Sequence, residues 1–166
     1  AGLGTQTSAF CIGGNRSNES NIVYSWDGSS WTGGTNLNTA RNTLAASGTT
    51  TAGLAFGGRQ IPTSVNGETE SWNGSAWTEV SDLNTARYNL GGFGTSTSSL
   101  AVSGTGPTTN CESWDGTVWT EVNDVSTADN FFSSAAGADN TTGLSLRQTA
   151  TEEWAFPSTP VVATGQ

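Results

Sequence analysis

The sequence predicts an all-β protein, a β-propeller of about four four-stranded blades, because one unit recurs along the chain. A tryptophan reappears at spacings of 46, 42 and 40 residues, and in three copies a second tryptophan follows five residues later. The first tryptophan is Trp26, Trp72, Trp114 and Trp154, and the second is Trp31, Trp77 and Trp119. Repeats of about forty residues without helical periodicity are typical of propeller blades.

Between the tryptophan pairs lies a motif that predicts the first two strands of each blade. In the third copy, residues 89–95 form a stretch of small residues, a polar turn follows, and residues 99–104 alternate large with small side chains. In this second strand Leu100 and Val102 flank Ala101, as Leu54 and Phe56 flank Ala55. Such strands are apolar on both faces, so each sheet must stack on neighbouring sheets.

The tryptophan segments predict the third and fourth strands of each blade, joined by a tight hairpin. Asn73-Gly74 is a strong signal for a two-residue turn, and two other copies have Asp27-Gly28 and Asp115-Gly116 there. This turn pairs Trp72 with Ser75 and Glu70 with Trp77, which places both indoles and Glu70 on one face. A longer loop is expected to put the indoles on opposite faces.

With 166 residues, the chain has the length of a single repeat array. We expect four blades at approximately 1–37, 38–83, 84–125 and 126–166. They form either a complete small ring or part of a larger one. Arg41 and Arg87, in the NTAR segments that lead into the first strand of a blade, are expected to pair with acids or carbonyls of a neighbouring blade.

The repeat resembles the kelch repeat over nearly the whole chain. The shared features are an arginine, a small-residue strand, a large-residue strand ending in Gly-Gly, and a Trp in the last strand. The double glycines are Gly13, Gly14, Gly57 and Gly58, and the third copy has Ser103-Gly104 instead. Trp31, Trp77 and Trp119 stand at the kelch Trp position, and Trp26, Trp72 and Trp114 stand where kelch repeats usually have Tyr. The copies also resemble repeats in tail and other virion-associated proteins of marine bacteriophages.

Composition argues against several kinds of chemistry. The chain has no His and no Lys, and its net charge is −9. Without His it lacks the commonest general base and the commonest metal ligand, so we expect no enzyme activity, no catalytic or metal site and no cofactor. An acidic chain is a poor partner for nucleic acid, and no apolar run is long enough for membrane insertion. The two cysteines are expected to pack as small apolar groups rather than form a disulfide.

Ligand-binding residues are expected in loops and at the unpaired tryptophan. The six paired tryptophans are predicted to be core, because they occupy fixed repeat positions, whereas Trp154 has no partner. The loops between the second and third strands differ most between copies, and they carry Arg16, Arg59 and Gln60 as candidates.

The sequence therefore favours a non-enzymatic structural or adhesion module, such as a tail-fibre or decoration domain. Its expected location is the virion or the extracellular space. Its expected partners are other virion or surface subunits, copies of the same chain among them. The alternative is a secreted or surface lectin-like propeller whose partner is a glycan.

Overall fold

The structure is a computed structural model that describes residues 1–15, 19–60, 64–105, 108–126, 128, 134–137, 142–146, 151–155 and 161–163. All regular secondary structure in these residues is β-strand, so the all-β prediction is confirmed. The described part of the chain has no helix that is long and apolar enough to cross a membrane.

The strands form four antiparallel sheets of four strands, each connected as a meander. Sheet 1 contains β1 (Gly2–Thr5), β2 (Ser8–Asn15), β3 (Glu19–Trp26) and β4 (Trp31–Gly33). Sheet 2 contains β5 (Ala45–Gly48), β6 (Gly53–Phe56), β9 (Thr69–Trp72) and β10 (Trp77–Val80). Sheet 3 contains β11 (Gly91–Thr95), β12 (Ser98–Val102), β13 (Cys111–Trp114) and β14 (Trp119–Val122). Sheet 4 contains β15 (Ser134–Gly137), β16 (Thr142–Leu146), β17 (Thr151–Ala155) and β18 (Val161–Ala163).

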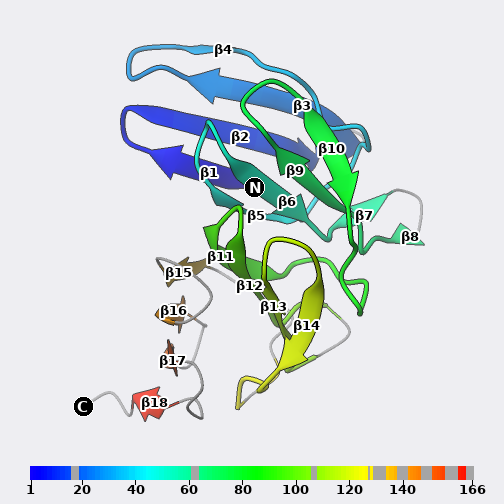
Figure 1. Ribbon diagram of the computed structural model, residues 1–166, viewed down its shortest axis with the longest axis vertical. Coiled ribbons are helices and arrows are strands. Elements are labelled where there is room, and N and C mark those ends of the chain that lie inside the picture. The colour runs from blue at the N-terminus through cyan, green and yellow to red at the C-terminus, as the bar shows by residue number, and fades with distance from the viewer. Residues whose placement is uncertain are drawn as a thin grey trace.

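The sheets follow one another along an open arc (Figure 1). Their first strands run along its inner side, with β1 beside β5, β5 beside β11 and β11 beside β15. Their last strands lie on the outer side, and sheets 1 and 4 stand at opposite ends of the arc. No comparable contact joins β15 to β1 among the described strands, so these strands do not close a ring. A small hairpin of β7 (Arg59–Gln60) and β8 (Ser64–Val65) extends from sheet 2.

Sheets 2 and 3 each pack their small-residue face on the large-residue face of the sheet before them. In β6, Leu54 and Phe56 join the core between sheets 2 and 3, whereas Ala55 joins the core between sheets 1 and 2. All three side chains are fully buried, as the alternating pattern predicts. The sheets approach so closely that a Cβ at Gly92 would lie 2.4 Å from the Phe56 ring. This spacing explains why the first strands are rich in Gly and Ala.

The outer hairpins have a longer turn than the sequence predicts. Trp72 pairs with Trp77 rather than with Ser75, so the loop has four residues. The Asn73 side-chain oxygen accepts the backbone N–H of Ser75 at 2.9 Å and of Ala76 at 3.0 Å, and Gly74 takes a φ of 97°. These bonds form an Asx turn, which competes with the two-residue turn. The indoles nevertheless share one face, because paired residues always do, and the expectation for a longer loop was wrong.

The double glycines lie at a register shift within β2 and directly after the end of β6, and each contacts the next NTAR segment. Gly13 and Gly57 have φ of 61° and 66°, and Gly14 and Gly58 have φ of 131° and 106°. The Gly14 N–H donates to the Arg41 carbonyl at 3.2 Å, and the Gly58 N–H donates to the Arg87 carbonyl at 2.9 Å. A Cβ at Gly57 would lie 2.8 Å from that same carbonyl. Positive φ and close approach both favour glycine here, while Ser103 takes a φ of 56° in the third copy.

Candidate functional site

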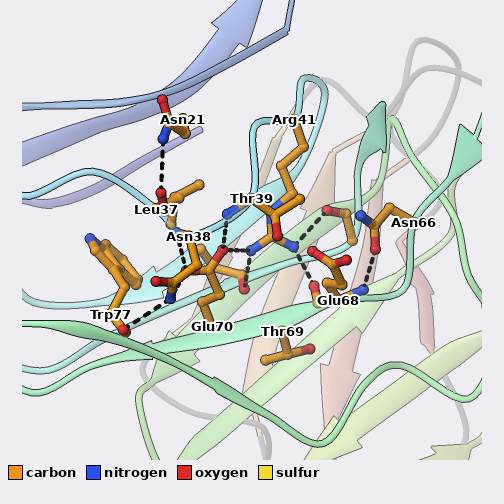
Figure 2. A network of polar contacts seen from close by, with 12 residues as sticks. Asn21, Leu37, Asn38, Thr39, Arg41, Asn66, Glu68, Thr69, Glu70 and Trp77 are labelled. Atoms are coloured by element: carbon orange, nitrogen blue, oxygen red, sulfur yellow. Dashed lines mark hydrogen bonds and ion pairs between the residues drawn. The ribbon is translucent and has the colours of Figure 1, made fainter. Parts of the chain in front are cut away.

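A buried carboxylate ties the connecting segment between sheets 1 and 2 to sheet 2 (Figure 2). Glu70 of β9 accepts hydrogen bonds from the Asn38 N–H at 2.8 Å, the Asn38 side-chain amide at 2.9 Å and the Thr39 N–H at 3.3 Å. Arg41 Nη2 forms an ion pair with Glu70 Oε1 at 3.1 Å, and both side chains are almost fully buried. Arg41 also donates to the carbonyls of Gly57 and Glu68. One carboxylate therefore fixes the whole NTAR turn.

Sheet 3 repeats this arrangement with the same residue types. Glu112 of β13 accepts from the Asn84 N–H at 2.7 Å, the Asn84 amide at 2.9 Å and the Thr85 N–H at 3.2 Å. Arg87 Nη1 lies 3.1 Å from Glu112 Oε1. The glutamate of the ESW motif and the Asn, Thr and Arg of the NTAR motif therefore recur together because they bind one another. Glu70 and Glu112 therefore have a structural role.

Arg41 and Arg87 pair with acids and carbonyls, as expected, but the acids do not belong to a neighbouring blade. Arg41 binds Glu70 of the sheet that it leads into, within the same predicted blade rather than a neighbouring one. Burial lowers the pKa of Arg41 and of Arg87, and the neighbouring carboxylates oppose this shift. Because guanidinium groups stay protonated in proteins, both pairs remain ionic. The buried charges make these turns sensitive to the loss of either partner.

The tryptophan pairs of sheets 2 and 3 are core residues. The Trp72 and Trp77 rings lie 5.3 Å apart, and Trp72 meets Phe10 of sheet 1 edge-on at 5.7 Å. Trp77 donates its indole N–H to the Thr35 carbonyl at 3.1 Å. In sheet 3 the Trp114 and Trp119 rings lie 5.4 Å apart, and Trp119 lies 4.9 Å from Phe56 of sheet 2. In both sheets the pair covers the large-residue face of the preceding sheet.

The same pair in sheet 1 is uncovered, so the prediction that all six paired tryptophans are core was wrong. Trp26 and Trp31 keep the same geometry, with rings 5.5 Å apart, and Trp26 donates to the Gln6 carbonyl at 2.9 Å. Trp31 is nevertheless 52% exposed, whereas Trp77 and Trp119 are 5% and 4% exposed. Among the described residues, no sheet packs on this face in the way that sheet 1 packs on the Trp72 and Trp77 face of sheet 2. The difference comes from position in the array and not from the residues of the pair.

Other exposed apolar side chains lie on the same face. Tyr24 is 41% exposed and Ile22 is 43% exposed, and both alternate along β3 with buried Val23. Tyr24 takes the repeat position of Glu70 and Glu112, two residues before the first tryptophan. Ile22, Tyr24, Trp26 and Trp31 are called the tryptophan face below. A surface of this kind marks a binding site more often than single exposed apolar residues do.

The two cysteines have different environments. Both are free thiols, so the expectation of no disulfide is confirmed for this structure. Cys111 is buried in the core of sheet 3, and burial raises its pKa to about 12. Cys11 pairs with Tyr24 across sheet 1 and is exposed on the tryptophan face. The expectation that both thiols pack as small apolar groups holds for Cys111 and is wrong for Cys11.

Only two of the four predicted ligand-binding residues, Arg59 and Gln60, have side chains that the structure describes. Arg59 and Gln60 are half-buried in β7, where the Arg59 guanidinium lies 5.3 Å from the centre of the Tyr88 ring. This stacking and the backbone pairing of Arg59 with Asn42 give Arg59 a packing role. Arg16 lies outside the described residues. The backbone of Trp154 lies in β17, but its side chain is also outside the description.

Within the described ranges, no three His, Cys, Asp or Glu side chains gather as metal ligands. A comparison with protein-family models and with curated proteins finds no match. The tryptophan face is therefore the strongest candidate functional surface. Sequence reasoning missed it, although Tyr24 in place of the repeated glutamate was a signal that sheet 1 differs from sheets 2 and 3.

Proposed function

We propose that the chain is a non-enzymatic structural module, a sector of a kelch-like β-propeller that forms part of a tail fibre or decoration protein on the outside of a virion. The observation that carries this proposal is the tryptophan face. In sheets 2 and 3 the tryptophan pair packs on the preceding sheet. In sheet 1 the equivalent pair is not covered by another sheet in the described residues. A surface with this chemistry is suited to protein contacts.

The propeller interpretation is supported by the repeated meanders and their order along the arc. Each sheet adds its first strand to the inner side, and in sheets 1 to 3 the outer strand carries a tryptophan, namely Trp31, Trp77 or Trp119. Radial stacking of four-stranded sheets is the arrangement that buries both faces of every sheet. The kelch-like order of Arg, double glycine and Trp supports the same interpretation.

The virion assignment is supported by the likeness of the repeat to those of bacteriophage tail proteins and by the surface composition. A chain with no Lys, no His and a net charge of −9 offers few groups for acid–base chemistry. Two of its repeated glutamates, Glu70 and Glu112, are committed to buried ion pairs. The groups that recur in this chain therefore serve packing rather than catalysis.

The proposal is tested by purifying virus particles from the source of the sequence and quantifying peptides of this chain by mass spectrometry. We expect the chain in the particle fraction at a fixed ratio to the major structural proteins. Recovery only in the soluble fraction of the host cell would overturn the assignment. Particles treated with protease on their outside should lose the chain before internal proteins, because the proposal places it on the exterior.

A lectin-like function is the second candidate, favoured by the exposed Trp31 ring and the half-buried Trp26 ring beside it. Indole faces can stack on sugar rings, and these two are open to solvent or half-buried. A glycan array with the purified chain tests this function. Binding that Trp31→Ser abolishes, with the circular dichroism spectrum unchanged, would favour the lectin. The matched control is Val118→Ser, which removes an exposed apolar side chain from a turn of sheet 3.

A further inference from the structure

The two junctions whose side chains the structure describes on both sides follow one rule. The tryptophan pair of the later sheet lies on the large-residue face of the earlier sheet, through Trp72 on Phe10 and Trp119 on Phe56. Each junction therefore has two different sides, a tryptophan side and a large-residue side. An array of such sheets has one unmatched side at each end, and the two unmatched sides are complementary.

Sheet 1 presents the unmatched tryptophan side, and the register of sheet 4 places the complementary residues on its far face. In sheet 4, Gly143 pairs with Trp154 and Ser145 pairs with Glu152. Gly53 with Trp72 and Ala55 with Glu70 are the equivalent pairs in sheet 2. Leu144 and Leu146 therefore occupy the register positions of Leu54 and Phe56, on the opposite face of the sheet from Trp154.

We propose that the tryptophan face of sheet 1 docks on the Leu144 and Leu146 face of sheet 4 of a second copy of this chain, and that two copies close a ring through two such junctions. This inference deepens the proposed structural function and rests on it. The occupant is a second copy because its sheet 4 carries the side of the junction that sheet 1 lacks. Heterologous contacts of this kind form a ring when the rotation between copies closes.

The arc argues against closure by the chain's own sheet 4. Sheet 4 lies beside sheet 3 through the contact of β15 with β11, at the far end of the arc from sheet 1 (Figure 1). To reach the tryptophan face it would have to leave that position. A second arc of the same shape can face the first across the open side and bring both pairs of ends together.

The chemistry of Tyr24 fits such a junction. Glu70 and Glu112 can be buried because a connecting segment of the same chain brings Asn, Thr and Arg to each carboxylate. Tyr24 carries no charge, so it can be covered by another sheet without an arginine partner. In the face that we assign to docking, Tyr24 therefore stands in place of the buried glutamate of sheets 2 and 3.

The test is sedimentation equilibrium of the whole chain at physiological salt, which limits repulsion between copies that each carry a charge of −9. We expect a monomer–dimer equilibrium for the wild type and for Val118→Ser. Trp31→Ser should raise the dissociation constant at least about 30-fold, as expected for a buried aromatic anchor. Tyr24→Glu should do the same by burying an unpaired carboxylate. Both changes are at exposed positions, so the monomer should stay folded.

Cys11 supplies a second readout on the same face. Its labelling by a maleimide should slow as the wild-type concentration rises through the dissociation constant, and it should stay fast in Trp31→Ser. A wild type that remains monomeric at about 100 μM would overturn the inference. Filaments instead of dimers would overturn the ring, and a dimer unaffected by Trp31→Ser would overturn the assigned face. A chain found in virus particles but monomeric in solution would refute only this inference and leave the proposed function standing.

Discussion

Replacement of Glu70 by Ala should destabilise the protein severely, because it breaks the hydrogen-bonded centre of the NTAR turn. Glu70 is 1% exposed and accepts bonds from two backbone N–H groups, one side-chain amide and Arg41. The substitution leaves a buried guanidinium without its carboxylate. It also leaves the N–H groups of Asn38 and Thr39 without their acceptor.

The expected loss in the free energy of unfolding is about 3–5 kcal/mol, the range for removing one partner of a buried ion pair. The lost hydrogen bonds belong to the same carboxylate, so their cost of about 1–3 kcal/mol each does not simply add to this range. Glu70→Gln should cost less, since it keeps the shape of the side chain and one acceptor oxygen. The double variant with Arg41→Met should lose less than the sum of the two single variants, because no buried charge is then unpaired.

The assay is urea unfolding at one fixed protein concentration, since assembly would add to the apparent stability. Tryptophan fluorescence and circular dichroism should give coincident transitions if the array unfolds as one unit. The matched control is Glu79→Ala, because Glu79 pairs with Glu70 across the hairpin but is exposed. We expect a change within about 0.5 kcal/mol for this control. A loss below about 1 kcal/mol for Glu70→Ala would refute the role of the buried carboxylate.

Three further outcomes follow from burial and hydrogen bonding. Trp77→Ala should cost about 3–5 kcal/mol in urea unfolding, because Trp77 is buried, and a cost below about 1 kcal/mol would refute its core role. Cys111, whose pKa burial raises to about 12, should resist thiol reagents at pH 8 until the chain unfolds, and fast labelling of the folded chain would contradict its buried position. Hydrogen bonds from the backbone of Ser30 and Ser29 hold the pKa of Asp27 at about 2, below its ordinary value of 3.8. The ionised Asp27 therefore adds stability above about pH 4 that is lost as the pH falls toward about 2. Asp27→Asn should remove this dependence, because Asn73 makes the same turn with a neutral amide, and an unchanged acid transition would contradict it.

The strands could be predicted from the sequence because their periodicity is strong and repeated. Leu100, Ala101 and Val102 show the two-residue alternation that a sheet buried on both faces requires, and all three are buried. The register of the outer hairpins could not be predicted from Asn73-Gly74 alone. The same two residues suit a two-residue turn and an Asx turn, and the Asn73 side chain selects the second by binding two backbone N–H groups.

The candidate site was harder to predict, because it depends on which sheet lies next to which. Trp31 and Trp77 are identical residues in equivalent positions, and only the preceding sheet distinguishes them. Repeat logic alone therefore assigns both to the core. The local signal was Tyr24, which stands where Glu70 and Glu112 bind an arginine. The partners of Arg41 could be predicted by type, as acids and carbonyls, but not by sheet.

Native mass spectrometry of the intact chain, together with electron-microscope images of the same sample, decides whether two copies close a ring. We expect particles of twice the chain mass that appear as closed rings, with the tryptophan face covered by the second copy. Particles of one chain mass would contradict this expectation, whether they appear as open arcs or as rings closed within a single chain. In the first case the tryptophan face would be a free surface, and in the second case sheet 4 of the same chain would cover it.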